Sequence, residues 1–335
     1  MKRASLFVIM LILIVGMSAF AGGRRDARDG QIRVAVAMSP MNNPFHVNLF
    51  RFIQEAIAEA PPNFHFTIYH AETNDVQVNV MELIYAGRYD GVLISTQDGN
   101  LMAEPSARLH RQGARTVVIN RALDTDEWDA YVTGDNVGSG TAAAKHMGRV
   151  LNGRGNVFIV GMTLGTPIAE ERSRGFLEVM RTEFPNINIL GTAEGGNNVE
   201  LGFNAMQNIL AAHPHIDAIY THDPFSAQGQ EQAIINAGRR DVRMILASGV
   251  DFTSIRYFEQ NPNTIFKGGG LYPPSMSGDG IRTLIRILQG ETPCTHRAAG
   301  CGCPLPRIQF IDAGLLLFEN LDQWRHLVPP GWDCG

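Results

Sequence analysis

Two adjacent amides and an aromatic residue stand where the first predicted strand of the chain gives way to the first predicted helix. Asn42, Asn43 and Phe45 follow the apolar run 32–37 and open a helical run over about residues 44–59. In a nucleotide-binding α/β protein this turn is rich in glycine, so that the backbone can approach phosphate. Here it has no glycine. Amides donate and accept hydrogen bonds and a ring offers a flat apolar face, so the turn predicts a neutral, hydroxyl-rich ligand.

Further polar side chains follow the other predicted strands. Ligands of open α/β sheets bind beyond the carboxyl ends of the strands, and the candidates there are Asn120, Arg121, Arg172, Asn197, His222, Asp223, Asp251 and Tyr272. Planar amide, carboxylate and guanidinium groups make paired hydrogen bonds to adjacent hydroxyls, while rings cover the apolar C–H faces of a sugar. These candidates also have structural alternatives. Asn43, Asp223 and Asp251 suit helix caps, and Phe45 suits a core position.

The elements that must position these residues alternate along the chain. Apolar runs rich in β-forming residues are separated by helical runs, which indicates parallel sheets with helices on both faces. The pattern resets near residues 131–136, which suggests two sheets, and Asp135 or Asn136 would cap the helix that follows. The predicted strands cover residues 32–37, 65–69, 91–95, 115–119, 130–133, 156–160, 187–191, 218–221, 243–248 and 264–267.

Length, charge and the N-terminus set the class of protein. The 335 residues are about right for two domains, and a net charge of −5 offers no basic footprint for nucleic acid. Residues 1–21 combine two cations, a short apolar run and a small-x-small site, which predicts a cleaved secretory signal and a periplasmic protein; an uncleaved anchor is the alternative. Residues 22–30 look like a disordered leader.

The four cysteines fall near the C-terminal end of the chain, at Cys294, Cys301, Cys303 and Cys334. In an exported protein they predict two disulfides, in which Cys301 and Cys303 each pair with Cys294 or Cys334. A metal site made of these thiols and His296 is the alternative, although the spacing matches no common zinc pattern.

Motifs for catalysis are weak. The chain has no Gly-x-Ser-x-Gly elbow, His-Glu-x-x-His pair or phosphate loop, so we expect no catalytic residue, no metal and no cofactor. His213 and His215, with His222, could build a metal-dependent hydrolase, but the first two precede a strand and suit a surface turn. The run Gly268–Gly270 predicts a hinge or a site of close packing.

Seven segments together give the chain a specific resemblance. They are MNNPF (41–45), DGVLIS (90–95), VINR (118–121), TGDNV (133–137), AEERSRGF (169–176), NAMQNIL (204–210) and GVD (249–251). In their order and spacing they resemble the sugar-binding periplasmic proteins of ABC transporters, the ribose and galactose/glucose binding proteins.

The resemblance implies two Rossmann-like lobes with parallel sheets, joined by three hinge strands that close on a ligand. The lobes would comprise residues 31–133 with 272–311 and residues 134–271 with 312–335. The matching pocket positions are Asn43, Phe45, His46, Asn120, Arg121, Arg172, Asn197, His222, Asp251 and Leu271. His46 and Asn197 stand where the ribose pattern has aromatics, and His222 and Leu271 stand where it has amides.

We therefore expect an exported solute-binding protein, most simply a monomer, that delivers a sugar or sugar-like molecule to an ABC permease. A protein of the same fold that feeds a chemoreceptor or sensor kinase is the alternative. The ligand itself is not predicted.

Overall fold

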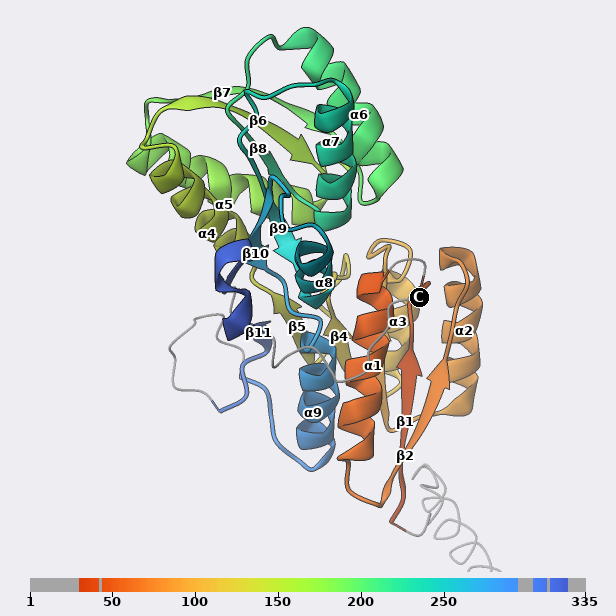
Figure 1. Cartoon of the computed structure of the whole chain (residues 1–335). Coiled ribbons are helices and arrows are strands. Elements are labelled where there is room, and N and C mark those ends of the chain that lie inside the picture. Colours follow the sequence, from red (N-terminus) through yellow and green to blue (C-terminus); the bar gives the residue numbers. More distant parts are fainter. Residues whose placement is uncertain (1–29, 42–43, 295–303, 312–313, 325–335) are drawn as a thin grey trace, which may run out of the picture.

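Two six-stranded sheets organise the computed structural model, which describes residues 30–41, 44–294, 304–311 and 314–324 (Figure 1). The first sheet has the order β11-β5-β4-β3-β1-β2, with β1 Ile32–Ala37, β2 Phe64–Tyr69, β3 Gly91–Ser95, β4 Arg115–Ile119, β5 Ala130–Gly134 and β11 Ile308–Ile311. The second has the order β12-β10-β9-β8-β6-β7, with β6 Gly155–Gly161, β7 Ile187–Glu194, β8 Ala218–Thr221, β9 Met244–Val250, β10 Phe266–Leu271 and β12 Leu315–Leu317. Described strand pairs are parallel, apart from β10 with β12.

Helices cover both faces of each sheet, as the alternation predicts. The first sheet carries α1 Pro44–Ala58 and α9 Met276–Leu288 on one face, and α2 Asn74–Gly87 and α3 Ala103–Arg111 on the other. The second carries α4 Asn136–Val150 and α5 Pro167–Glu183 on one face, and α6 Val199–Ala212 and α7 Pro224–Asn236 on the other. α8 Phe252–Gln260 and the 3₁₀ helix η1 Phe318–Gln323 complete the second lobe.

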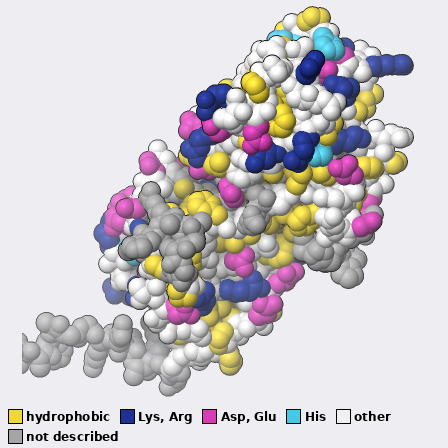
Figure 2. All heavy atoms as spheres, turned by 90° about the vertical axis from the view of Figure 1, so that its left-hand side faces the viewer, with side chains coloured by type: hydrophobic (Ala, Val, Ile, Leu, Met, Phe, Trp, Pro, Cys, Tyr) yellow, Lys and Arg dark blue, Asp and Glu magenta, His cyan; other side chains and the backbone are white. Residues whose placement is uncertain are grey.

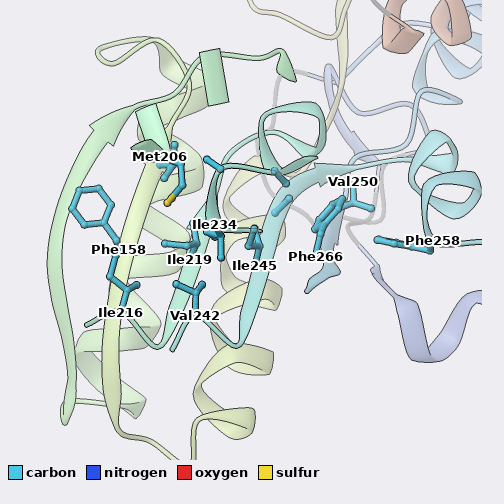
Figure 3. Packing of buried hydrophobic residues seen from close by; sticks show 14 of the residues in the cluster. Phe158, Met206, Ile216, Ile219, Ile234, Val242, Ile245, Val250, Phe258 and Phe266 are labelled. Atoms are coloured by element: carbon cyan, nitrogen blue, oxygen red, sulfur yellow. The ribbon is translucent and has the colours of Figure 1, made fainter. Parts of the chain in front are cut away.

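Alternation within the buried strands explains why both faces are covered. On β6, Phe158 and Val160 pack towards α6 and α7, whereas Val157 and Ile159 pack towards α4 and α5. Figure 3 shows the first of these clusters, in which Phe158, Ile219 and Ile245 come from neighbouring strands. A strand that is apolar on both faces cannot face water, so these sequences require helices on either side.

The chain passes between the two sheets after β5, after β10 and after β11. This confirms the two-lobed fold with three connections. We propose lobe boundaries at 133/134, 271/272 and 311/312. The first lies one residue before the end of β5, and the other two lie at the ends of β10 and β11; after each of these strands the next element packs on the other sheet.

Strand β10 runs further than the sequence predicts. We expected it to end at Lys267, but it continues through Gly268, Gly269 and Gly270 to Leu271. A Cβ at Gly269 would lie 1.7 Å from the carbonyl oxygen of Ala247, so the glycines let neighbouring backbones approach closely. Of the two interpretations offered for this run, close packing describes these contacts.

Several sequence predictions fall outside the described residues. These include the signal segment 1–21, the leader up to residue 29, Asn42 and Asn43, and Cys301, Cys303 and Cys334. Cys294 is described and its backbone forms hydrogen bonds with Leu305 and Arg307, but the disulfide pairing stays a prediction.

Among the helices in the described ranges, none has the length and apolar character of a membrane span. On the face shown in Figure 2, acidic and basic side chains lie intermixed.

Candidate functional site

A cavity of about 60 Å³ lies between the lobes, at the carboxyl ends of strands from both sheets. The first lobe contributes residues that follow β1 and β4, and the second contributes residues that follow β6, β7, β8 and β9; Tyr272 follows β10 at the crossing. The lining residues are Phe45, His46, Asn120, Arg121, Met162, Ile168, Arg172, Asn197, Asp223, Pro224, Phe225, Gly249, Asp251 and Tyr272.

The structure brings most of the predicted site residues to this cavity. The predicted residues that line it are Phe45, His46, Asn120, Arg121, Arg172, Asn197 and Asp251. Asn43 lies outside the described residues. His222 and Leu271 lie elsewhere. The ligand-binding roles of these residues stay predictions.

Arg172 is fixed beneath the cavity by neutral groups. Its Nε donates to Asn136 Oδ1 at 3.0 Å and its Nη1 donates to the carbonyl of His222 at 2.5 Å. Its guanidinium lies 4.9 Å from the centre of the Tyr272 ring. Burial lowers the pKa of Arg172, and within the described ranges no carboxylate lies within 4.0 Å of it. A charge buried in this way needs polar partners, and the amide oxygen of Asn136 and the carbonyl of His222 are two of them.

Gly249 makes room for this arginine. Its φ is +78°, which favours glycine, and a Cβ there would lie 2.5 Å from Nη1 of Arg172. Gly249 therefore has two roles at the site: it adopts the turn that the backbone needs, and it leaves space for the guanidinium of Arg172.

Two carboxylates line the second-lobe wall at helix N-termini. Asp223 Oδ1 accepts hydrogen bonds from the backbone of Phe225 and Ser226, both at 2.9 Å, and so caps α7. Asp251 Oδ1 accepts from the backbone and hydroxyl of Thr253 and caps α8. Burial raises the pKa of each to about 6. The predicted caps are therefore present, and both caps also line the cavity.

The first-lobe wall presents Asn120 and Arg121. Asn120 has φ +69°, a left-handed conformation that asparagine tolerates better than most residues. Its carbonyl accepts hydrogen bonds from Tyr131 and Thr133 at 2.8 and 2.9 Å, which hold this turn in place. Arg121 Nη1 donates to the carbonyl of Gln97 at 2.6 Å, and burial lowers the pKa of Arg121.

Phe45 and His46 complete that wall. Phe45 packs against the first-lobe core and also lines the cavity, so both roles considered for it apply. Burial, and then the nearby charge of Arg121, lower the pKa of His46 to about 4. His46 is therefore neutral at neutral pH and adds no charge to the wall.

His222 and Leu271 lie behind the cavity lining. His222 is fully buried; its Nδ1 accepts from the backbone of Met162 at 3.3 Å, and its Nε2 lies 3.1 Å from Ser173 Oγ. Burial lowers its pKa to about 3. Leu271 belongs to the second-lobe core because β10 extends to it, and the next residue, Tyr272, lines the cavity instead.

Sequence reasoning missed the apolar members of the wall. Met162, Ile168, Pro224 and Phe225 line the cavity, but apolar residues after a strand carry no pattern that separates a ligand contact from a core contact. The sequence favours Asp223 as a helix cap, and the structure shows that it also lines the cavity. Tyr272 lines the cavity too, although it is not among the predicted ligand-binding residues.

The histidines considered for a metal site do not meet. His215 precedes β8, with its Nε2 3.4 Å from Asp217, whereas His222 follows the other end of that strand. The His213 ring lies 5.0 Å from that of Phe158. In the described part of the chain, no three His, Cys, Asp or Glu residues gather as metal ligands would.

Comparison with known proteins gives a consistent picture. The family model for a periplasmic binding protein domain matches residues 34–292. The ribose import binding protein RbsB of Escherichia coli K12 is 24% identical over 283 residues, which cover 84% of this chain and 92% of that protein. The D-allose-binding periplasmic protein of the same organism is 24% identical over 248 residues, or 71% and 76% of the two chains.

A solved structure is similar in fold. An ABC transporter solute binding protein from Bacillus halodurans C-125, with bound myo-inositol, has a TM-score of 0.76 and 17% identity, and the match covers 90% of this chain and 100% of that one.

Proposed function

The chain belongs to the periplasmic binding protein family, as the match over residues 34–292 shows. We propose that it is an exported protein that binds a sugar or sugar-like molecule and delivers it to the permease of an ABC transporter. The observation that carries this proposal is the cavity between the lobes, where guanidinium, carboxylate and amide groups face one another beside an aromatic ring. Such groups bind hydroxyls in pairs. No bond is made or broken in this function.

Each wall has a distinct part in binding. In the second lobe, Arg172 donates to ligand oxygens and Asp251 accepts from ligand hydroxyls. In the first lobe, Asn120 and Arg121 donate, and Phe45 covers an apolar face of the sugar. Asn43 is proposed as a further partner on the strength of its position in the sequence. A ligand that bonds both walls favours the arrangement in which they are close, and this differential contact drives hinge closure.

Contacts between the lobes support a closed arrangement. The ring of Phe52 on α1 lies 6.0 Å from that of Phe252 on α8, on the side where these two helices approach each other (Figure 1). Tyr272 also joins both lobes through its backbone and its hydroxyl. We expect ligand addition to reduce the radius of gyration measured by X-ray scattering. A radius that does not change on saturation with ligand would contradict closure.

Native mass spectrometry of the protein purified from a periplasmic extract tests the proposal directly. We expect a co-purified neutral molecule of sugar mass, and a protein mass that begins near Gly22 after signal cleavage. Titration calorimetry with D-ribose, D-xylose, D-arabinose, D-glucose and D-galactose then measures affinity. Absence of both a co-purified molecule and any binding within this panel would contradict a sugar-binding role.

Ligand affinity should fall as the pH falls from about 7.5 to 5. Asp223 and Asp251 have pKa values raised to about 6, so both are ionised at the higher pH and protonated at the lower. Each carboxylate that must ionise to accept a ligand hydroxyl costs about tenfold in affinity one pH unit below its pKa. The two histidines of the site region have lower pKa values and stay neutral throughout.

Calorimetry at both pH values checks this expectation, with Asp251→Asn as the control that keeps a capping group and removes one titration. The variant should show a weaker pH dependence than the parent. The raised pKa favours the protonated form in the folded state, so these two groups do not destabilise the ligand-free protein as the pH falls to 5. An affinity independent of pH in the parent would contradict ionised carboxylates as acceptors.

A sensing role is the second candidate. The fructose binding periplasmic domain of the hybrid two component system BT1754 has a similar fold, with a TM-score of 0.73 and 20% identity. Neighbouring genes for a permease and an ATPase, and loss of sugar uptake when this chain is deleted, would favour transport. Normal uptake in the deletion strain would favour sensing.

A further inference from the structure

Asn48 is a buried amide that has no hydrogen-bond partner in the described part of the chain. It lies on α1 with 0% of its surface exposed. Its side-chain nitrogen Nδ2 and oxygen Oδ1 are both buried, and the described residues provide a partner for neither. Burying an amide costs free energy unless its donor and acceptor are satisfied. Packing of α1 on the first sheet does not require an amide at this position.

Helical spacing places Asn48 on the face of α1 that meets the second lobe. It follows Phe45 by three residues and precedes Phe52 by four, so the three side chains lie along one face. Phe45 lines the cavity, and the ring of Phe52 lies 6.0 Å from that of Phe252 on α8 of the second lobe (Figure 1). Asn48 therefore lies between the ligand cavity and the contact of α1 with α8.

Closure on a ligand also brings α8 onto this face. Asp251 lines the cavity and caps α8, and Phe252 is the first residue of that helix. A movement that carries Asp251 to a ligand held by the first lobe therefore carries Phe252 to α1. Phe252 is 2% exposed in this arrangement, so water is excluded where the two helices meet.

The first lobe covers a neighbouring side of α1. Ser277 Oγ of α9 donates to the carbonyl of Leu49 at 2.7 Å. A Cβ on Gly278 of α9 would lie 3.0 Å from the carbonyl oxygen of Phe52. If α9 alone buried Asn48, the amide would be buried before and after closure. If α8 completes the cover, the amide meets water in the open state and loses it on closure, and the two cases differ in their effect on ligand affinity.

We propose that Asn48 opposes closure of the ligand-free protein. In the open state water bonds its amide, and in the closed state the amide is buried between the lobes without a partner from the described residues of either. Closure is then unfavourable until ligand contacts offset this cost. Because only the closed state holds the ligand with both walls, the amide lowers the affinity without touching the ligand. This inference rests on the proposed binding function and names a residue that regulates it.

Asn48→Leu tests the proposal, because leucine is similar in size and has neither polar atom. We expect calorimetry with D-ribose, D-xylose, D-arabinose, D-glucose and D-galactose to show tighter binding of each sugar that binds the parent. The gain should be at least about fivefold, the lower end of the effect of an unsatisfied buried group. It should be the same for every sugar, since Asn48 touches none of them, whereas a residue in contact with the ligand would change the order of preference.

Val47→Leu is the matched control, because Val47 is the preceding residue of α1 and is 48% exposed. Its affinities should equal those of the parent. Asn48→Ala removes the same two polar atoms with a smaller side chain, so it should also tighten binding and serves as the test if leucine does not fit.

Unchanged or weaker affinities in Asn48→Ala, or in a folded Asn48→Leu, would overturn the proposal and leave the proposed function standing. Unchanged affinities together with a raised free energy of unfolding in urea would overturn it in a specific way, because they would assign the burial of Asn48 to the first lobe alone. If no sugar of the panel binds the parent or the variants, the proposed function fails and this inference fails with it.

Discussion

Replacing both Arg172 and Asp251 with alanine is expected to abolish measurable ligand binding, with a loss of at least about a hundredfold in affinity. A hydrogen bond to a charged group contributes about 1.5–3 kcal/mol, and removal of one partner leaves other buried groups without theirs. Arg172 is held by Asn136 and His222, and Asp251 lies on the same wall of the cavity. The two substitutions remove a donor and an acceptor from one wall. The ligand then has fewer contacts that form only in the closed state, so it stabilises that state less.

Titration calorimetry with the tightest-binding sugar of the panel measures this effect. Arg181→Ala is the matched control for the arginine, because Arg181 lies on the same helix, α5, but is exposed and bonds Glu178. Asp251→Asn separates binding from folding, since asparagine also caps helices well. If the double variant kept an affinity within about twofold of the parent, the assignment of these residues to the ligand would be wrong, because two charged hydrogen bonds cannot be worth so little.

The strand ends could be predicted because two constraints act at them together. A buried strand needs apolar residues on both faces, and the polar residue that stops the run must lie at the edge of the sheet. This is why Asn120 and Arg121 follow β4, and Asp251 follows β9, in the structure as in the prediction. The caps could be predicted for a similar reason, because the backbone N–H groups at the start of α7 and α8 need acceptors nearby.

Leu271 and Tyr272 show one limit of the prediction. The sequence places Tyr272 just after a strand, and Tyr272 lines the cavity, whereas Leu271 is predicted only from its match to the family pattern and packs in the second-lobe core. Matching a pattern of positions does not show which of two adjacent residues faces the cavity. His222 shows a second limit. Its polar type suggested a ligand contact, but Ser173 and the backbone of Met162 satisfy both ring nitrogens from a neighbouring helix and loop, which no local pattern reveals.

The largest effect on stability is expected at Gly269, where alanine should lower the free energy of unfolding by more than about 4 kcal/mol. Its φ of +152° belongs to a region that side chains rarely adopt, and a Cβ would lie 1.7 Å from the carbonyl oxygen of Ala247 on β9. Strain of this kind alone costs about 1–3 kcal/mol. The clash adds to it because backbone on the adjacent strand cannot move without breaking the pairing of β9 with β10.

Urea unfolding of Gly269→Ala against Gly238→Ala isolates this clash. Gly238 also has a positive φ, +64°, but a Cβ there would meet no atom within 4 Å, so its substitution should cost only about 1–2 kcal/mol from backbone strain. Equal losses in the two variants would mean that the strands separate easily at Gly269 and that close packing is not the reason for glycine there. A much larger loss at Gly269 would show that the close packing of β10 against β9 requires glycine at this position.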